Sequence, residues 1–299
     1  MSTERVWAAG GVRSRGDLRP ALGERAFRYG DGVFATLMLR NSRLLDADAH
    51  LDRLAGSTRR VGLALPDPVN TAERLAEIVS RLGAAPGTDC IVRVQVSAGP
   101  GGRGYGRCSE EETGDGPWEL VELFAPPAAR RLRITVLADG LVPVPALPEV
   151  KSCSALAHVL CARAATEAGV DEAIRVSGGA ILEASAANVF WTSGSTLFTP
   201  SSTLPLYPGV TRAVVLAVAE AEGWTVEEGS WPPGAIAGAD AVFLSNATRG
   251  VEPVTAVGDA AMGWPEAVER LRLAVSIARD EAATRLPSGS DRTGRPEKR

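Results

Sequence analysis

The chain has 299 residues, 45% hydrophobic and 23% charged, which is typical of a globular protein with one large or two medium-sized domains. Its Lys and Arg residues are dispersed and the net charge is −4, which argues against nucleic acid or an anionic membrane as a partner. No apolar run approaches the roughly 20 residues of a membrane-spanning helix, and no secretory signal follows Met1. We therefore expect a cytoplasmic protein.

The first half of the chain mixes strand and helix patterns. Residues 32–46 alternate as a β-hairpin with Asn41-Ser42 near its turn. Helical periodicity follows in residues 48–63 and 71–83, and two strands are expected at 90–98 and 118–126. These elements predict a small N-terminal α/β domain over residues 1–126.

A proline-rich stretch, 127–150, contains one expected strand at 132–137 and is interpreted as the connection between two domains. Beyond it, we expect a C-terminal domain of mixed β structure with helices over 151–285, and a disordered tail at 286–299. Its expected elements are two hairpins turning at Gly178-Gly179 and Gly194-Ser195, a strand at 239–247, and helices at 151–169, 209–224 and 265–286.

The segment between the strands at 90–98 and 118–126 contains Gly99-x-Gly101-x-x-Gly104, the spacing of a dinucleotide-binding turn. That turn needs a helix directly after the glycines, because the helix N-terminus holds the pyrophosphate. Here Gly114, Gly116 and Pro117 break any helix early. The segment is therefore predicted to be a strand–loop–strand unit, and an NAD-dependent oxidoreductase is not expected.

The cysteines and histidines do not suggest a metal site. We expect reduced, buried thiols, since no Cys-x-x-Cys pair occurs among the four cysteines, Cys90, Cys108, Cys153 and Cys161. His50 and His158 are not clustered, which argues against a histidine-based metal centre. A Ser-His-Asp triad stays open, although no Gly-x-Ser-x-Gly turn supports it.

Lys151 stands at the very start of the helix expected at 151–169, with Ser152 or Ser154 as its N-cap. The positive end of a helix dipole favours a neutral amine, which can form a Schiff base. A solvated lysine at a domain edge is the alternative. Glu183 stands among apolar and small residues, so it lies either on an exposed edge or beside a buried cation.

Pro208-Gly209 precedes a helix with Thr211 in its first turn. Free N–H groups and a hydroxyl at such a position suit a phosphate, although an ordinary capped helix has the same pattern. Arg53 is either a surface residue of its helix or the cation that a phosphate requires.

Five segments in this order resemble the fold-type IV pyridoxal-phosphate enzymes, which include branched-chain and D-amino-acid aminotransferases and aminodeoxychorismate lyases. They are "YGDGVFAT…HLDRL", Lys151, "DEAIRVSGGAILEASAANVFW", "YPGVTR" and "VFLSNATRGVEPV", and the resemblance extends from about residue 27 to 258. It implies a two-domain α/β (α+β) fold, pyridoxal 5′-phosphate as cofactor, and a homodimer with active sites near the subunit interface.

The resemblance also implies roles for individual residues. Lys151 matches the lysine that joins the cofactor, Glu183 the carboxylate that pairs with the pyridine nitrogen, and Arg53 the arginine that binds the phosphate. The phosphate cradle and a second phosphate-side loop are matched by Val210, Thr211, Asn246 and Ala247. Ala247 stands where many aminotransferases have Ser or Thr, so one side-chain hydrogen bond is absent.

Within this family, "GGRGY" resembles a loop of the aminodeoxychorismate lyases in which the arginine, here Arg103, faces a substrate carboxylate. Branched-chain aminotransferases have a tyrosine five residues after the lysine, where this chain has Leu156, as is usual in the lyases. Ser154 and Ala155 do not reproduce the Asn-Arg of some lyases. Thr36 and Tyr105 are further candidates for the substrate pocket.

We therefore expect 4-amino-4-deoxychorismate lyase activity, with a class IV aminotransferase as the alternative. A non-catalytic binding protein with the same fold is a third reading. The set Lys151, Glu183, Arg53 and Thr211 argues against it.

Overall fold

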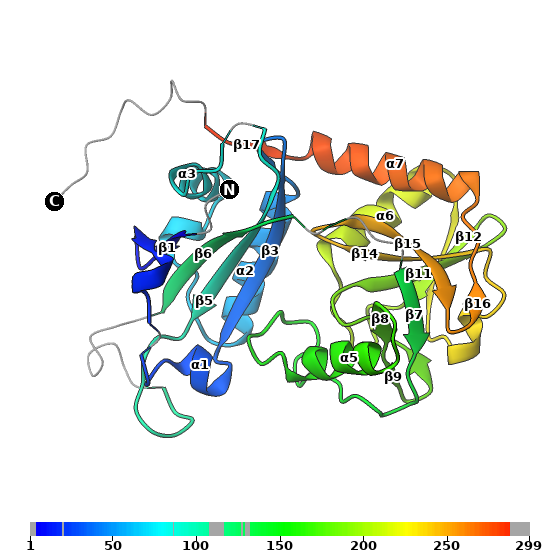
Figure 1. Cartoon of the computed structure of the whole chain (residues 1–299), viewed down its shortest axis with the longest axis horizontal. Helices are drawn as coiled ribbons and strands as arrows, with labels where there is room; N and C mark the ends of the chain where they lie inside the picture. Colours follow the sequence, from blue (N-terminus) through cyan, green and yellow to red (C-terminus); the bar gives the residue numbers. More distant parts are fainter. Residues whose placement is uncertain are drawn as a thin grey trace. The chain divides into compact units, whose positions relative to one another are not determined.

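The computed structural model describes residues 4–19, 21–85, 87–107, 117–126, 128 and 132–287. The described residues form two compact units (Figure 1). Unit 1 comprises those of Met1–Pro126 and Ala282–Arg299, and unit 2 those of Pro127–Glu281. Both units combine a sheet with helices, which makes the chain a mixed α/β protein.

Unit 1 is built on a seven-stranded antiparallel sheet in the order β17-β4-β3-β5-β6-β1-β2. Its strands are β1 (Arg5–Ala8), β2 (Gly11–Ser14), β3 (Gly32–Arg40), β4 (Arg43–Leu44), β5 (Cys90–Ser97), β6 (Trp118–Phe124) and β17 (Thr284–Arg285). The hairpin expected at 32–46 is confirmed. Asn41 and Ser42 both have positive φ, 48° and 62°, as a two-residue turn requires.

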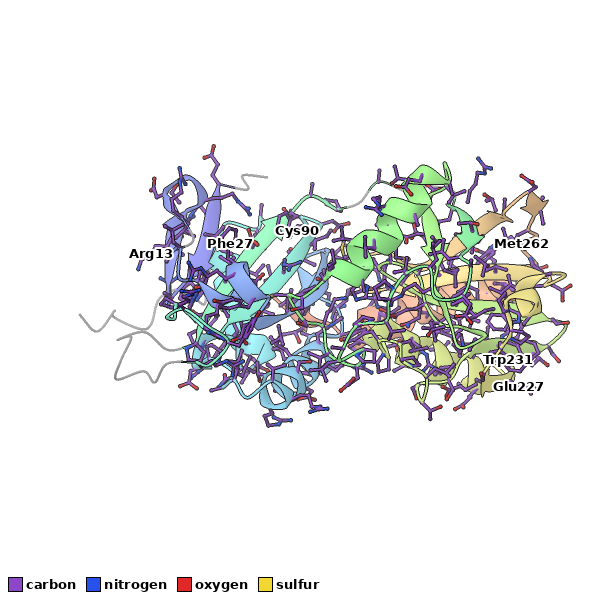
Figure 2. All side chains as sticks on the ribbon, turned by 90° about the horizontal axis from the view of Figure 1, so that it is seen from below. Arg13, Phe27, Cys90, Glu227, Trp231 and Met262 are labelled. Carbon is purple, nitrogen blue, oxygen red and sulfur yellow. The ribbon has the colours of Figure 1, made fainter. Side chains whose placement is uncertain are left out.

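The helices of unit 1 follow the predicted periodicity. Helices α2 (Ala47–Arg60) and α3 (Ala72–Arg81) bury their apolar faces, and Thr71 caps α3 by accepting from the Arg74 N–H at 3.3 Å. The other helical segments are α1 (Arg25–Tyr29) and the short 3₁₀ turns η1 (Arg15–Asp17) and η2 (Asp67–Val69). The exposed Phe27 of α1 is labelled in Figure 2.

Unit 2 has a mixed sheet in the order β13-β12-β11-β14-β15-β7-β8, with β16 paired to β15. A separate hairpin, β9 (Val176–Ser177) and β10 (Ala180–Ile181), turns at Gly178 and Gly179, as expected. The sheet strands are β7 (Leu132–Val136), β8 (Glu172–Ile174), β11 (Asn188–Ser193), β12 (Thr196–Pro200), β13 (Thr225–Gly229), β14 (Ala241–Asn246), β15 (Gly250–Val257) and β16 (Ala260–Ala261).

Three α-helices pack on the strands of unit 2: α5 (Leu156–Glu167), α6 (Val210–Ala221) and α7 (Glu266–Glu281) (Figure 1). A 3₁₀ turn, η3 (Pro233–Ile236), completes the unit. Its core is apolar and aromatic: Phe190 stacks on Phe243 with ring centroids 5.0 Å apart. None of the described helices combines the length and hydropathy needed to cross a bilayer.

Several expectations require correction. The C-terminal helix ends at Glu281 rather than residue 286, and β17 then pairs with β4, so 282–285 belong to unit 1. The strand expected within the connection at 127–150 is β7, and it lies within the sheet of unit 2. Helix α5 begins at Leu156 with Ala155 as N-cap, because the Ser152 hydroxyl instead accepts from the Ser154 N–H.

The described cysteines are free thiols. Cys90 and Cys161 are buried, and burial raises the pKa of each thiol to about 11. Cys153 is only half-buried, contrary to expectation, and Cys108 lies outside the described residues.

Candidate active site

Lys151 is half-buried in unit 2, and its Nζ lies 5.0 Å from the centre of the Tyr207 ring. The chain has only two lysines, Lys151 and Lys298, against 30 arginines. An amine can act as a nucleophile or general base where a guanidinium cannot, because arginine is not deprotonated in proteins. The scarcity of lysine is therefore a further sequence signal for Lys151.

Glu183 is only 4% exposed, and its cationic partner is the fully buried Arg175. The Arg175 Nη2 donates to Glu183 Oε1 at 2.5 Å. On the other side, Glu183 Oε2 accepts from the Tyr207 N–H at 3.1 Å. Of the two environments that the sequence left open, the buried pair is the one observed. Burial raises the pKa of Glu183 to about 7, because it outweighs the opposing effect of the Arg175 cation.

Asn188 connects this carboxylate to the start of α6. Its Nδ2 donates to the Tyr207 carbonyl at 2.7 Å, and its Oδ1 accepts from the Gly209 N–H at 3.1 Å. A Cβ on Gly209 would lie 2.6 Å from Asn188 Oδ1, so the close approach requires glycine. Gly209 is the N-cap of α6, and Val210 is its first residue.

Thr211 lies in the first turn of α6, as predicted, and is 2% exposed. Its Oγ1 is buried and has no hydrogen-bond partner among the described residues. The N–H groups of a helix's first turn also lack intrahelical partners. Ser245, whose hydroxyl is likewise buried and unpartnered, lies opposite Asn188 in the β11–β14 register. Unsatisfied donors therefore gather where β11 begins and β14 ends.

Asn246 and Ala247 follow Ser245 in a tight turn. The Asn246 Oδ1 accepts from the N–H groups of Thr248 and Arg249 at 3.1 and 2.9 Å. The Ala247 carbonyl accepts from Arg279 Nη2 at 2.7 Å. The turn is thus held by its own side chain and by a buried arginine of α7.

The glycine-rich loop of unit 1 is tied to Arg25, a residue that the sequence analysis missed. Arg25 donates to the carbonyls of Gly104, Tyr105 and Gly106 at 3.3, 2.7 and 2.9 Å. Its Nε bonds Asp31 at 2.8 Å. Burial raises the pKa of Asp31, but hydrogen bonds from Arg107 and Arg25 outweigh burial and hold it below its usual value. The described part of the loop, up to residue 107, therefore has a fixed backbone.

The remaining predicted site residues also belong to unit 1. Arg103 and Tyr105 project from the loop, with Arg103 exposed and Tyr105 88% exposed. Thr36 is half-buried on β3, opposite Arg93 of β5. Arg53 is half-buried on α2.

The structure thus brings the six predicted residues of unit 2 to one end of its large sheet. It adds Arg175, Asn188, Tyr207 and Ser245, which sequence reasoning missed. Arg175 carried a readable signal, a lone cation within the apolar run "AIRV"; it lies between β8 and β9, directly across from Glu183. Tyr207 and Ser245 carried none, since their roles depend on contacts distant in sequence.

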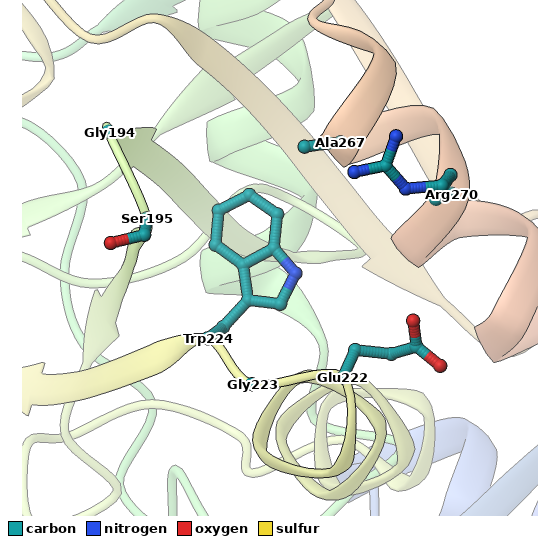
Figure 3. A pocket seen from close by; sticks show the side chains of 7 residues that line it. All are labelled: Gly194, Ser195, Glu222, Gly223, Trp224, Ala267 and Arg270. Atoms are coloured by element: carbon teal, nitrogen blue, oxygen red, sulfur yellow. The ribbon is translucent and has the colours of Figure 1, made fainter.

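A separate cavity of about 260 Å³ lies at the other end of α6, lined by Gly194, Ser195, Glu222, Gly223, Trp224, Ala267 and Arg270 (Figure 3). Helix α6 has 12 residues, so its two ends are about 18 Å apart at 1.5 Å per residue. The charged groups here, Glu222 and Arg270, are exposed. The cavity therefore contributes nothing to the site around Lys151. The described residues include no cluster of three or more metal-ligating side chains.

Comparison with known proteins gives concordant results. The sequence model of the family "Amino-transferase class IV" matches residues 32–257. An aminodeoxychorismate lyase from Vibrio harveyi is 27% identical, covering 79% of this chain and 86% of that protein. A D-alanine aminotransferase from Bacillus licheniformis is 25% identical, with coverages of 85% and 88%. The fold matches the branched-chain amino acid aminotransferase from Escherichia coli with a TM-score of 0.84 at 19% identity, over 96% of this chain and 100% of that one.

Proposed function

Because the chain belongs to the amino-transferase class IV family, we propose that it is a pyridoxal-phosphate enzyme with 4-amino-4-deoxychorismate lyase activity. Such an enzyme converts aminodeoxychorismate into 4-aminobenzoate and pyruvate. The Vibrio harveyi relative supports this reaction, and the Bacillus licheniformis relative supports the alternative, an aminotransferase.

The donor groups of unit 2 fit the cofactor. The unpartnered Thr211 hydroxyl and the free N–H groups of the first turn of α6 suit a phosphate. Lys151 would hold the aldehyde carbon, and Glu183 would pair with the pyridine nitrogen. The turn at Asn246 and Ala247 and the cation of Arg53 are assigned to the phosphate on family resemblance.

When bound, pyridoxal phosphate supplies an electron sink for the carbon that bears the substrate amine. Once displaced by the substrate amine, the Lys151 Nζ would be free to take the proton from that carbon, acting as a general base. The C–O bond to the enolpyruvyl group then breaks, and its oxygen leaves with the electron pair. A ring C=C bond forms in its place, which gives 4-aminobenzoate, and the enolpyruvate gains a proton to become pyruvate. Glu183 would favour a proton on the ring nitrogen throughout.

The main support for a lyase over an aminotransferase comes from the glycine loop and its Arg103. The loop carbonyls of Gly104, Tyr105 and Gly106 accept their hydrogen bonds from Arg25. The side chain of Arg103 is exposed on this loop, where its guanidinium can bind a substrate carboxylate. A planar guanidinium binds a carboxylate through two parallel hydrogen bonds, and the substrate carries two carboxylates. Leu156, 68% exposed, stands where branched-chain aminotransferases have a tyrosine.

The test is a product assay with the cofactor-loaded protein and aminodeoxychorismate generated from chorismate and an amine donor. We expect equal amounts of 4-aminobenzoate and pyruvate, and none from Lys151→Ala. Arg103→Lys should raise KM at least about tenfold, since a bidentate pair is lost. Absence of 4-aminobenzoate from the loaded protein, with keto acid formed from amino donors, would establish the aminotransferase instead. Family resemblance also implies a homodimer, which light scattering would detect.

A further inference from the structure

The buried ion pair of Arg175 and Glu183 has a high desolvation cost for a contact with a purely structural role. Arg175 is 0% exposed, and the only side-chain hydrogen bond it makes among the described residues runs from Nη2 to Glu183 Oε1. Its Nε and Nη1 are buried without partners. Desolvating two charges is expensive, and apolar residues often fill such a site with equal or greater stability. A role in chemistry explains the pair better than a role in folding.

The local backbone places this arginine directly across from the carboxylate. The Arg175 N–H donates to the Glu183 carbonyl at 2.9 Å, and the Leu182 N–H donates back to the Arg175 carbonyl at 2.9 Å. The two residues thus face each other across the hairpin that β9 and β10 extend. Arg175 can therefore act on Glu183 without a side-chain rearrangement.

The other charged groups around the pair are identifiable. Lys151 acts on Glu183 as a further cation. The half-buried His158 of α5 is neutral, because burial, with the Arg175 and Lys151 charges, lowers its pKa to about 4. Glu172 accepts a hydrogen bond from the Ser185 hydroxyl. Among these groups Arg175 is the cation in direct contact with Glu183.

We propose that Arg175 is a positioning residue that keeps Glu183 ionised, so that a proton shared between Glu183 and the cofactor's pyridine nitrogen stays on the ring. The inference rests on the proposed cofactor but not on the choice of lyase over aminotransferase. A guanidinium bonded to the carboxylate attracts it more strongly than it repels a more distant cation. The ionised carboxylate with a protonated ring is therefore favoured over the neutral pair.

The experiment uses the protein loaded with pyridoxal phosphate that carries ¹⁵N in its ring, whose NMR shift reports protonation of that nitrogen. Wild type should show a protonated ring at pH 7.5. Arg175→Met should lower the ratio of protonated to unprotonated ring about tenfold, equivalent to one pKa unit. Arg175→Gln, which keeps a donor but loses the charge, should behave like Arg175→Met, and Arg175→Lys should stay close to wild type. These two variants also decide the matter if Arg175→Met does not fold.

Arg175→Met in a Glu183→Gln background separates this role from a structural one. With no carboxylate present, removing the arginine should leave ring protonation unchanged or raise it. A fall as large as in the wild-type background would overturn the proposal, as would an unchanged ¹⁵N shift in folded, cofactor-loaded Arg175→Met and Arg175→Gln. Arg272→Met, which breaks the pair with Glu269 on α7, is the matched control and should change nothing. If wild type itself does not bind the cofactor, it is the proposed function that fails.

Discussion

At the scale of single residues, Glu183 and His158 act on stability with opposite signs in the cofactor-free protein. The pKa of Glu183 rises from 4.5 to about 7 on folding, so the folded state binds more protons and stability falls as pH rises through that window. The pKa of His158 falls from 6.5 to about 4, so stability rises with pH across that window. The two contributions largely cancel where the windows overlap.

Single substitutions should reveal each contribution. The difference in free energy of unfolding, variant minus wild type, should increase from pH 4.5 to 6.5 for Glu183→Gln. For His158→Gln the same difference should decrease over this range. We expect changes of about 1–2 kcal/mol, the smaller for the partly exposed His158. Urea unfolding at the two pH values measures this. Parallel pH profiles for all three proteins would contradict the burial of these groups in their neutral forms.

The Thr211 hydroxyl should matter for binding and not for folding. Replacing an unpartnered buried hydroxyl with a methyl group leaves no polar atom unsatisfied, so Thr211→Val should match or exceed wild type in stability. Its Kd for pyridoxal phosphate should rise about tenfold, the equivalent of one lost hydrogen bond to an anion. Thr192→Val on β11 is the control, since its hydroxyl is equally buried and unpartnered. An equal loss of affinity in both variants would argue against a phosphate at Thr211.

At the scale of elements, the start of α6 depends on Gly209. Its φ of −58° would accept alanine, but the Cβ would lie 2.6 Å from Asn188 Oδ1. Gly209→Ala should therefore lower the free energy of unfolding by about 1–3 kcal/mol, the usual cost of overpacking. Gly234→Ala, where a Cβ meets nothing within 4 Å, should be near neutral. Chemical denaturation of both variants would show the difference, and equal stability would mean that Asn188 can move aside.

The glycine loop is an element to which one side chain, Arg25, contributes three hydrogen bonds. Arg25→Met removes the donors to three loop carbonyls, so local opening should become easier. We expect tryptic cleavage after Arg103 to accelerate about tenfold, the effect of roughly 1.4 kcal/mol of lost contacts. Arg28→Met, at an exposed position of α1, is the control. Unchanged cleavage in Arg25→Met would show that the loop is held by other contacts.

At the scale of the whole molecule, local patterns predicted most elements and long-range pairing decided the rest. Turn chemistry identified the hairpins at Asn41-Ser42 and Gly178-Gly179, and periodicity identified α2, α3 and α6. Strand β17 could not be predicted, because its short sequence acquires strand structure only by pairing with β4. The predicted N-cap of α5 was wrong, because the Ser152 hydroxyl accepts from the Ser154 N–H before the helix begins.

The site shows the same division. The residue types and order of Lys151, Glu183 and Thr211 pointed to their chemistry. The contacts that hold them, Tyr207 beside Lys151 and Asn188 beside Gly209, arise from chain segments that meet only in the folded unit. The sequence predicted a buried cation beside Glu183 as one of two alternatives. Only the backbone pairing of the folded hairpin identifies that cation as Arg175.

Whether unit 2 holds pyridoxal phosphate at Lys151 is tested by locating the bound cofactor. The loaded protein would be reduced with borohydride, digested and analysed by peptide mass spectrometry. Lys298, the second lysine of the chain, serves as an internal control. We predict one pyridoxyl group per chain on Lys151 and none in Lys151→Arg. A group on Lys298 alone, or no group at all, would contradict the account.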